Sequence, residues 1–202
     1  MLGAQTNAAD STAKPTLISS AAARAADSLR TRRRRYGQVM TIGFVTSILA
    51  HESGHFIAGY VVGGHPHLGL SDGKPTVFSG LNEYLGKHKQ FVFSAAGLTV
   101  QELVDELVLD IPHSRGSAFE RGILAGGVGT TLFYTTLGRN SSVSDISVMA
   151  RTSSLSKTKI SLIFGSFSAL HTLRMARNGH YAHFFAMPAE NGVKMGVSLR
   201  PE

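Results

Sequence analysis

Residues 37–64 read GQVMTIGFVTSILAHESGHFIAGYVVGG, an apolar run with three ionisable side chains near its middle. These side chains are His51, Glu52 and His55, in the spacing H-E-x-x-H. Ionisable groups are unfavourable inside an apolar segment, so a run that keeps them indicates a functional site. Residues four apart share one face of a helix, so His51 and His55 can offer imidazole nitrogens to one metal ion. Glu52 would then lie beside a water at that ion and act as its general base.

The composition limits which side chains can bind this metal. The chain has 202 residues and no cysteine, which excludes a disulfide framework, a thiolate metal site and a cysteine nucleophile. Any metal must therefore be held by histidine and carboxylate side chains.

The net charge of +7 is unevenly distributed, because residues 1–36 hold seven basic and two acidic residues. We predict a flexible basic arm over residues 1–36 and a single domain over residues 37–202. Residues 19–35 could alternatively form a basic amphipathic helix on an anionic membrane surface, or belong to an organelle transit peptide. No aromatic residues are interleaved with the arginines, so no nucleic-acid partner is expected.

Four arginines, Arg32 to Arg35, directly precede the apolar run. By the positive-inside rule, this order predicts a membrane-spanning helix over about residues 37–62, with the N-terminus on the cytoplasmic side. The membrane could be that of an organelle. Further helices are expected over residues 91–109, 117–138 and 157–177. The predicted fold is a mainly α, polytopic membrane bundle of about four helices, with membrane lipid as a partner. A mean hydropathy of +0.05 leaves open a soluble helical domain whose apolar helices are buried.

Two segments outside the helices have strand-like patterns. Residues 63–90 are dense in Gly and Pro, which predicts a loop with one or two short strands after the first helix. Asn191-Gly192 in the C-terminal tail indicates a possible hairpin. His65 and His67 are interpreted as surface histidines, and His171, near the end of the last helix, as a packing or interfacial residue.

The stretch HESGHFIAGYVVGG resembles the site-2 protease family of membrane-embedded zinc metalloproteases. The following HLGLSDGKPTVFSG is similar to the strand-forming loop of that family. Residues 96–101, AGLTVQ, are similar to its A-G-P-x-x-N patch, with Leu for Pro and Gln for Asn. The resemblance covers roughly residues 40–110. It implies Zn²⁺ at His51 and His55, Glu52 as the catalytic base, and a membrane-associated polypeptide as substrate.

The family takes its third metal ligand from an aspartate motif that this chain lacks. Asp145 is our preferred third ligand, because it precedes the last apolar helix in the downstream half of the chain. Asp145 could instead be a helix N-cap in a Ser-rich linker. Glu102, Asp105 and Asp110 are further candidates.

Three functions remain open at this point. The first is a membrane-bound zinc metalloprotease that hydrolyses peptide bonds of membrane-associated polypeptides. The second is a non-catalytic membrane protein that retains the protease-like scaffold and serves, with a partner membrane protein, as a subunit or scaffold of a larger complex. The third is a soluble zincin-like hydrolase.

Overall fold

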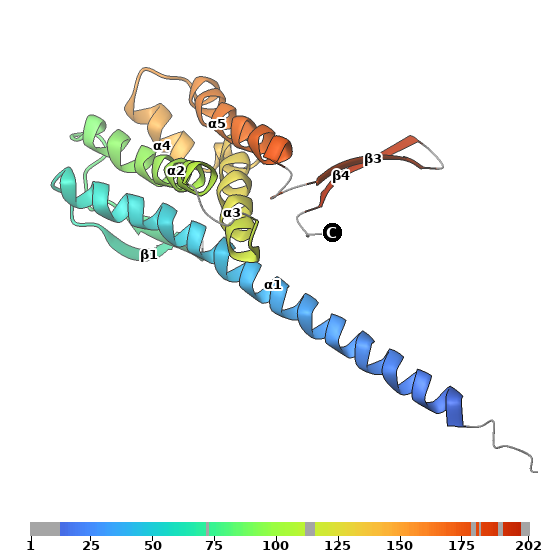
Figure 1. Cartoon of the computed structure of the whole chain (residues 1–202). Helices are drawn as coiled ribbons and strands as arrows, with labels where there is room; N and C mark the ends of the chain where they lie inside the picture. The colour runs from blue at the N-terminus through green and yellow to red at the C-terminus, as the bar shows by residue number, and fades with distance from the viewer. Residues whose placement is uncertain are drawn as a thin grey trace, which may run out of the picture. The chain divides into compact units, whose positions relative to one another are not determined.

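The structure is a computed structural model that describes residues 13–71, 73–111, 116–178, 181, 183–189 and 192–198. It is mainly helical (Figure 1). The elements are α1 (Ala13–Val61), β1 (His67–Ser71), β2 (Lys74–Phe78), α2 (Lys87–Asp110), α3 (Ala118–Thr135), the 3-10 helix η1 (Gly138–Asn140), α4 (Asp145–Thr152), α5 (Lys157–Asn178), β3 (His183–Ala189) and β4 (Gly192–Ser198). The chain divides into two units, residues 1–38 and 39–202, and the candidate site lies wholly in the second.

The prediction of a polytopic membrane bundle is wrong. Within the described residues, no helix combines the length and the apolar character needed to cross a membrane. The predicted span over residues 37–62 is helical, but its glycines, serines, threonines and histidines lower its hydropathy. Helix α2 carries four acids in its second half, and α5 has basic residues in its first and last turns. The multi-pass localisation with a cytoplasmic N-terminus is therefore corrected as well.

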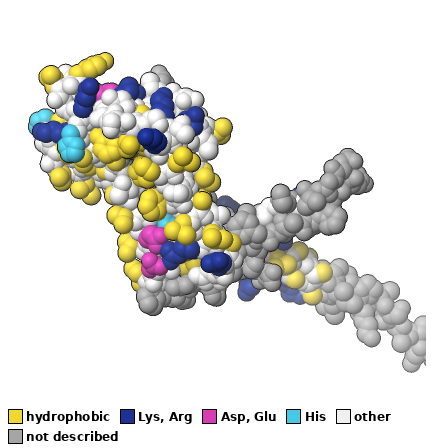
Figure 2. Space-filling view, turned by 90° about the horizontal axis from the view of Figure 1, so that it is seen from above, with side chains coloured by type: hydrophobic (Ala, Val, Ile, Leu, Met, Phe, Trp, Pro, Cys, Tyr) yellow, Lys and Arg dark blue, Asp and Glu magenta, His cyan; other side chains and the backbone are white. Residues whose placement is uncertain are grey.

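Two clusters of buried hydrophobic side chains form the core of the second unit. One contains Leu109, Leu124, Val128, Met175 and Tyr181, and the other contains Leu98, Ile146, Met149 and Ile160. Other hydrophobic side chains are exposed between basic and acidic ones on the face seen in Figure 2. The two buried clusters hold the helices of the second unit together.

Helix α1 packs closely on α2 and α3 at positions that lack a Cβ atom. A Cβ at Gly54 would lie 2.7 Å from the carbonyl oxygen of Ala96 in α2. A Cβ at Gly126 of α3 would lie 2.7 Å from the Ser47 Cβ atom. The glycines therefore allow the backbone of α1 to approach α2 directly beside the H-E-x-x-H motif.

Helix α4 is short and is positioned by its apolar face. Ile146 and Met149 are fully buried against Leu98 of α2 and Ile160 of α5. Burying a side chain of this size contributes about 1.5–3 kcal/mol. This packing brings the first residue of α4, Asp145, to α2 and the motif.

A small antiparallel sheet follows α1. Helix α1 ends near Gly63, whose φ of 78° gives the left-handed conformation common after a helix. Strands β1 and β2 pair from His67↔Phe78 to Ser71↔Lys74. Strands β3 and β4 form a second antiparallel pair near the C-terminus.

Candidate metal centre

The structure brings His51, His55 and Asp145 together in a buried triangle. The two Nε2 atoms lie 3.1 Å apart, and the carboxylate faces both, with Oδ2 3.2 Å from His51 Nε2 and Oδ1 3.4 Å from His55 Nε2. Ligand atoms around a tetrahedral zinc ion, each about 2.0–2.1 Å from it, are about 3.3 Å apart. The triangle therefore has the size of one face of such a site, and these three residues could hold a metal ion.

Both imidazole rings are oriented through their other nitrogen. His51 Nδ1 lies 3.2 Å from Gln101 Oε1, and His55 Nδ1 lies 2.8 Å from the carbonyl oxygen of Phe93. Gln101 is oriented in turn, because its Nε2 donates to Ser47 Oγ at 3.0 Å. Both acceptors require a proton on Nδ1, which leaves each Nε2 lone pair for a metal ion. Partners of this kind fix the tautomer of metal-binding histidines.

The histidines reach this arrangement because α2 has no side chain at Gly97. A Cβ there would lie 2.3 Å from His55 Nε2 and 2.7 Å from His51 Nε2. Carbon and nitrogen atoms do not approach this closely without displacement. Gly97 is therefore the position on which the convergence of both rings depends.

Asp145 can face the histidines because its neighbour caps α4. The Ser144 hydroxyl accepts from the backbone N–H of Ser147 at 3.2 Å, as an N-cap residue does. The alternative that Asp145 is itself the cap therefore does not describe this helix. Its carboxylate is available to the histidines, and its role as a metal ligand stays a prediction.

The charges of the metal-free cluster are tightly coupled. Burial would lower the pKa of His55, but the charge and hydrogen bond of Asp145, the Phe93 carbonyl and Glu52 together raise it to about 9. Burial would raise the pKa of Asp145, but His55 and His51 hold it well below its usual range. Without metal, the cluster is an ion pair between imidazolium and carboxylate.

This coupling predicts how metal affinity changes with pH. Metal needs a neutral His55 imidazole, whereas a pKa of about 9 keeps the metal-free ring protonated at neutral pH. One proton must therefore leave on binding, and apparent affinity should rise about tenfold per pH unit up to about pH 9, then level off. Competition titrations of Zn²⁺ against a chelating dye at about pH 6.5, 7.5 and 8.5 measure this slope. A flat profile would contradict the coupling.

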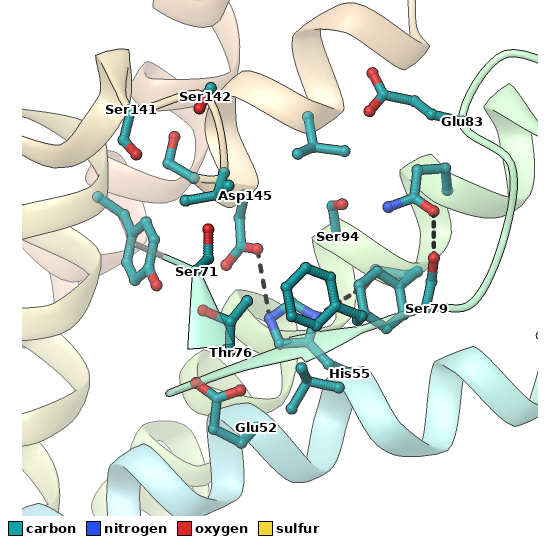
Figure 3. A pocket seen from close by; sticks show the side chains of 18 of the residues that line it. Glu52, His55, Ser71, Thr76, Ser79, Glu83, Ser94, Ser141, Ser142 and Asp145 are labelled. Carbon is teal, nitrogen blue, oxygen red and sulfur yellow. Dashed lines mark hydrogen bonds and ion pairs between the residues drawn. The ribbon is translucent and has the colours of Figure 1, made fainter. Parts of the chain in front are cut away.

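A pocket of about 510 Å³ opens onto this cluster (Figure 3). In Figure 3, Asp145 points from α4 toward His55, and the Glu52 side chain rises from α1 into the same space. Glu52 is half-buried and contributes to the electrostatics of His55. Strand β2 and the segment before α4 supply further lining residues, including Thr76, Val77 and Ser144. The carboxylate of Glu52 is therefore accessible to a molecule held beside the cluster.

Tyr134 adds a hydroxyl to the pocket. Its ring stacks on His51, with ring centroids 5.6 Å apart and an interplanar angle of 13°. Burial, and then the charges of Asp145 and Glu52, raise the pKa of the phenol above its usual value. Tyr134 therefore remains a neutral hydrogen-bond donor at any physiological pH.

The other acids considered as third ligands lie elsewhere. Glu102 and Asp105 form a second buried cluster with His171, which could also hold a metal ion. Asp110 pairs with Arg174. The exposed His67 ring stacks on Phe78 at the pocket, and its Nδ1 lies 3.1 Å from the His65 carbonyl oxygen.

Sequence reasoning missed the residues that support the histidines, namely Gly97, Gln101, Tyr134 and the Phe93 carbonyl. The sequence holds a signal for the first two, because residues 96–101 are similar to a patch of the resembling family. That comparison assigned them no role. The contacts of Phe93 and Tyr134 depend on helix packing and have no local pattern.

No protein-family model, curated protein or solved structure matches this chain. The geometry of the site and the resemblance of the motif are therefore the observations that bear on function.

Proposed function

We propose that this protein is a zinc-dependent metallopeptidase in which His51, His55 and Asp145 bind the ion and Glu52 is the general base. The observation that carries the proposal is the triangle of ligand atoms, with separations of 3.1, 3.2 and 3.4 Å, beside a pocket that Glu52 also lines. The resemblance of HESGH to a zinc-protease motif supports the same assignment.

The donor set suits zinc in a catalytic role. Zinc enzymes commonly use three protein ligands and leave a fourth position open. Two histidines and one carboxylate also suit ferrous iron. The carboxylate of Glu52, placed where it can accept a proton, favours hydrolysis over oxygen chemistry.

Each residue then has a definite task. A zinc ion bound at this site would act as a Lewis acid, which polarises a carbonyl group and lowers the pKa of a bound water. Glu52 accepts the proton of the attacking water and returns it to the leaving amine. Tyr134, kept neutral by burial and by Asp145 and Glu52, donates a hydrogen bond into the pocket. Gln101 and the Phe93 carbonyl keep the imidazoles oriented.

The walls of the pocket support a polypeptide substrate. Residues 75–78 of β2 line the pocket. Strand β2 has one partner strand, β1, in a two-stranded sheet, so its other edge faces no strand of that sheet. Extended peptides commonly add to a strand edge through main-chain hydrogen bonds. A peptide aligned with β2 would run past Glu52 and Asp145.

The proposal is tested by hydrolysis of a quenched-fluorescence peptide library. Activity should fall to background after a chelator removes the metal, and should return when Zn²⁺ is added back. His51→Asn should lose both the activity and the ion held at this centre, because it removes one of three ligands. His88→Asn is the matched control, since His88 is exposed at the start of α2.

Two results would contradict the proposal. A chain that stays fully active without metal would exclude metal catalysis. A chain that binds zinc through His51 but hydrolyses no peptide would instead favour the non-catalytic alternative.

A further inference from the structure

A second group of buried ionisable side chains lies outside the pocket. Glu102 and Asp105 come from α2 and His171 comes from α5, with exposed fractions of 8%, 1% and 0%. None of the three lines the pocket described above. Gln101, which holds His51, directly precedes Glu102 in the sequence. Asp105 lies four residues beyond Gln101, so the second cluster follows the first along α2 toward its C-terminal end.

The second cluster leaves the Asp105 carboxylate without a hydrogen-bond donor among the described residues. His171 Nδ1 lies 3.0 Å from Glu102 Oε2 and 3.7 Å from Asp105 Oδ2. His171 Nδ1 and Glu102 Oε2 form an ion pair when the imidazole is protonated, whereas neither oxygen of Asp105 accepts a hydrogen bond from any residue that the structure describes. A buried carboxylate that no hydrogen-bond donor reaches is strongly unfavourable. The arrangement is therefore incomplete as protein alone.

Hydrogen bonds fix the orientation of the His171 and Glu102 side chains. His171 Nε2 lies 2.8 Å from Glu106 Oε1, which favours a proton on Nε2 and leaves Nδ1 facing the two carboxylates. Glu102 Oε1 accepts from Thr131 Oγ1 at 3.0 Å and Ser168 Oγ at 3.3 Å, so Oε2 is left toward His171. His171 and Glu102 are thus each held by one end, while Nδ1 and Oε2 face the cluster, as is typical of metal ligands.

The second cluster contains more acidic than basic side chains. Three carboxylates, those of Glu102, Asp105 and Glu106, surround one imidazole. The nearby Arg174 pairs with Glu106 and Asp110. A divalent cation would compensate this excess of negative charge.

We propose that Glu102, Asp105 and His171 bind a second divalent metal ion, which has a structural role and connects α2 to α5. The imidazole nitrogen and two carboxylate oxygens form a mixed donor set that suits zinc, manganese or ferrous ions. Helix α3 closes the site, because a Cβ at Gly127 would lie 2.1 Å from Asp105 Oδ2. This site is independent of the proposed catalytic function.

Metal stoichiometry tests the proposal. The full chain, stripped with a chelator and then equilibrated with Co²⁺ by dialysis, should bind two ions. His51→Asn should keep one ion, held by the second cluster, and Asp105→Asn should keep one, held by the first. Asp110→Asn is the matched control and should keep two, since Asp110 lies on the same helix with a largely exposed side chain paired to Arg174.

The outcomes separate this proposal from the proposed function. One ion in the wild-type chain that is lost in His51→Asn would overturn the second site and leave the first intact. One ion lost in Asp105→Asn but kept in His51→Asn would overturn the first site and support the second. If Asp105→Asn does not fold, the counts for the wild type and His51→Asn still decide. A Co²⁺-dependent rise in the melting temperature of His51→Asn is the second expected sign of the structural ion.

Discussion

Glu52→Gln should abolish peptide hydrolysis while leaving the metal bound. The amide preserves the size of the side chain but has no basic oxygen to accept a proton from water. Loss of a general base typically lowers the rate by about 10²–10⁴-fold. Glu52 is not among the three clustered ligands, so the number of bound zinc ions should not change. Single-turnover rates and metal analysis on the same preparation measure both quantities.

Ser53→Ala is the control for this variant. Ser53 is the next residue of α1, is exposed, and donates to the Leu49 carbonyl oxygen at 2.7 Å within the same helix. Its removal should change neither rate nor metal content. Wild-type activity in Glu52→Gln would exclude Glu52 as the base, whereas loss of zinc would show that Glu52 helps to bind it.

Gly97→Ala should disrupt the metal centre with one added methyl group. The new Cβ would lie 2.3 Å from His55 Nε2, and both imidazoles are buried and held by Gln101 and the Phe93 carbonyl. The rings or the helix must therefore move. Overpacking of this kind costs about 1–3 kcal/mol. We expect zinc affinity to fall about 100-fold, as when the orientation of metal-binding histidines is lost.

Gly129→Ala provides the matched comparison. Gly129 lies in α3, and a Cβ there would meet no atom within 4 Å. Replacing a helical glycine with alanine at such a position should stabilise the fold by about 1 kcal/mol and leave zinc affinity unchanged. Competition titration and thermal unfolding on both variants measure these effects. Unchanged zinc affinity in Gly97→Ala would show that the helices can separate without loss of the site.

The membrane prediction failed for a physical reason that the sequence already contained. The basic cluster at Arg32–Arg35 and the apolar run were interpreted together as a spanning segment, although residues 37–62 include many small and polar residues. Apolar patterning is common to membrane helices and to helices buried by protein, because the surroundings of both are apolar. The structure buries small or polar residues of this run, namely Ser47, His51 and His55, whereas large apolar side chains such as Leu49 and Ile57 are exposed.

The sequence by itself determined that His51 and His55 lie on the same face of a helix, because the helical period places residues four apart on one face. It also determined which residue types are available as ligands, since the chain contains no cysteine. Only the tertiary structure decided which carboxylate joins the histidines. Asp145 does so because Ile146 and Met149 pack α4 onto α2, whereas Glu102 and Asp105 face His171 on α5. That choice depends on contacts between residues far apart in the chain, which no local spacing encodes.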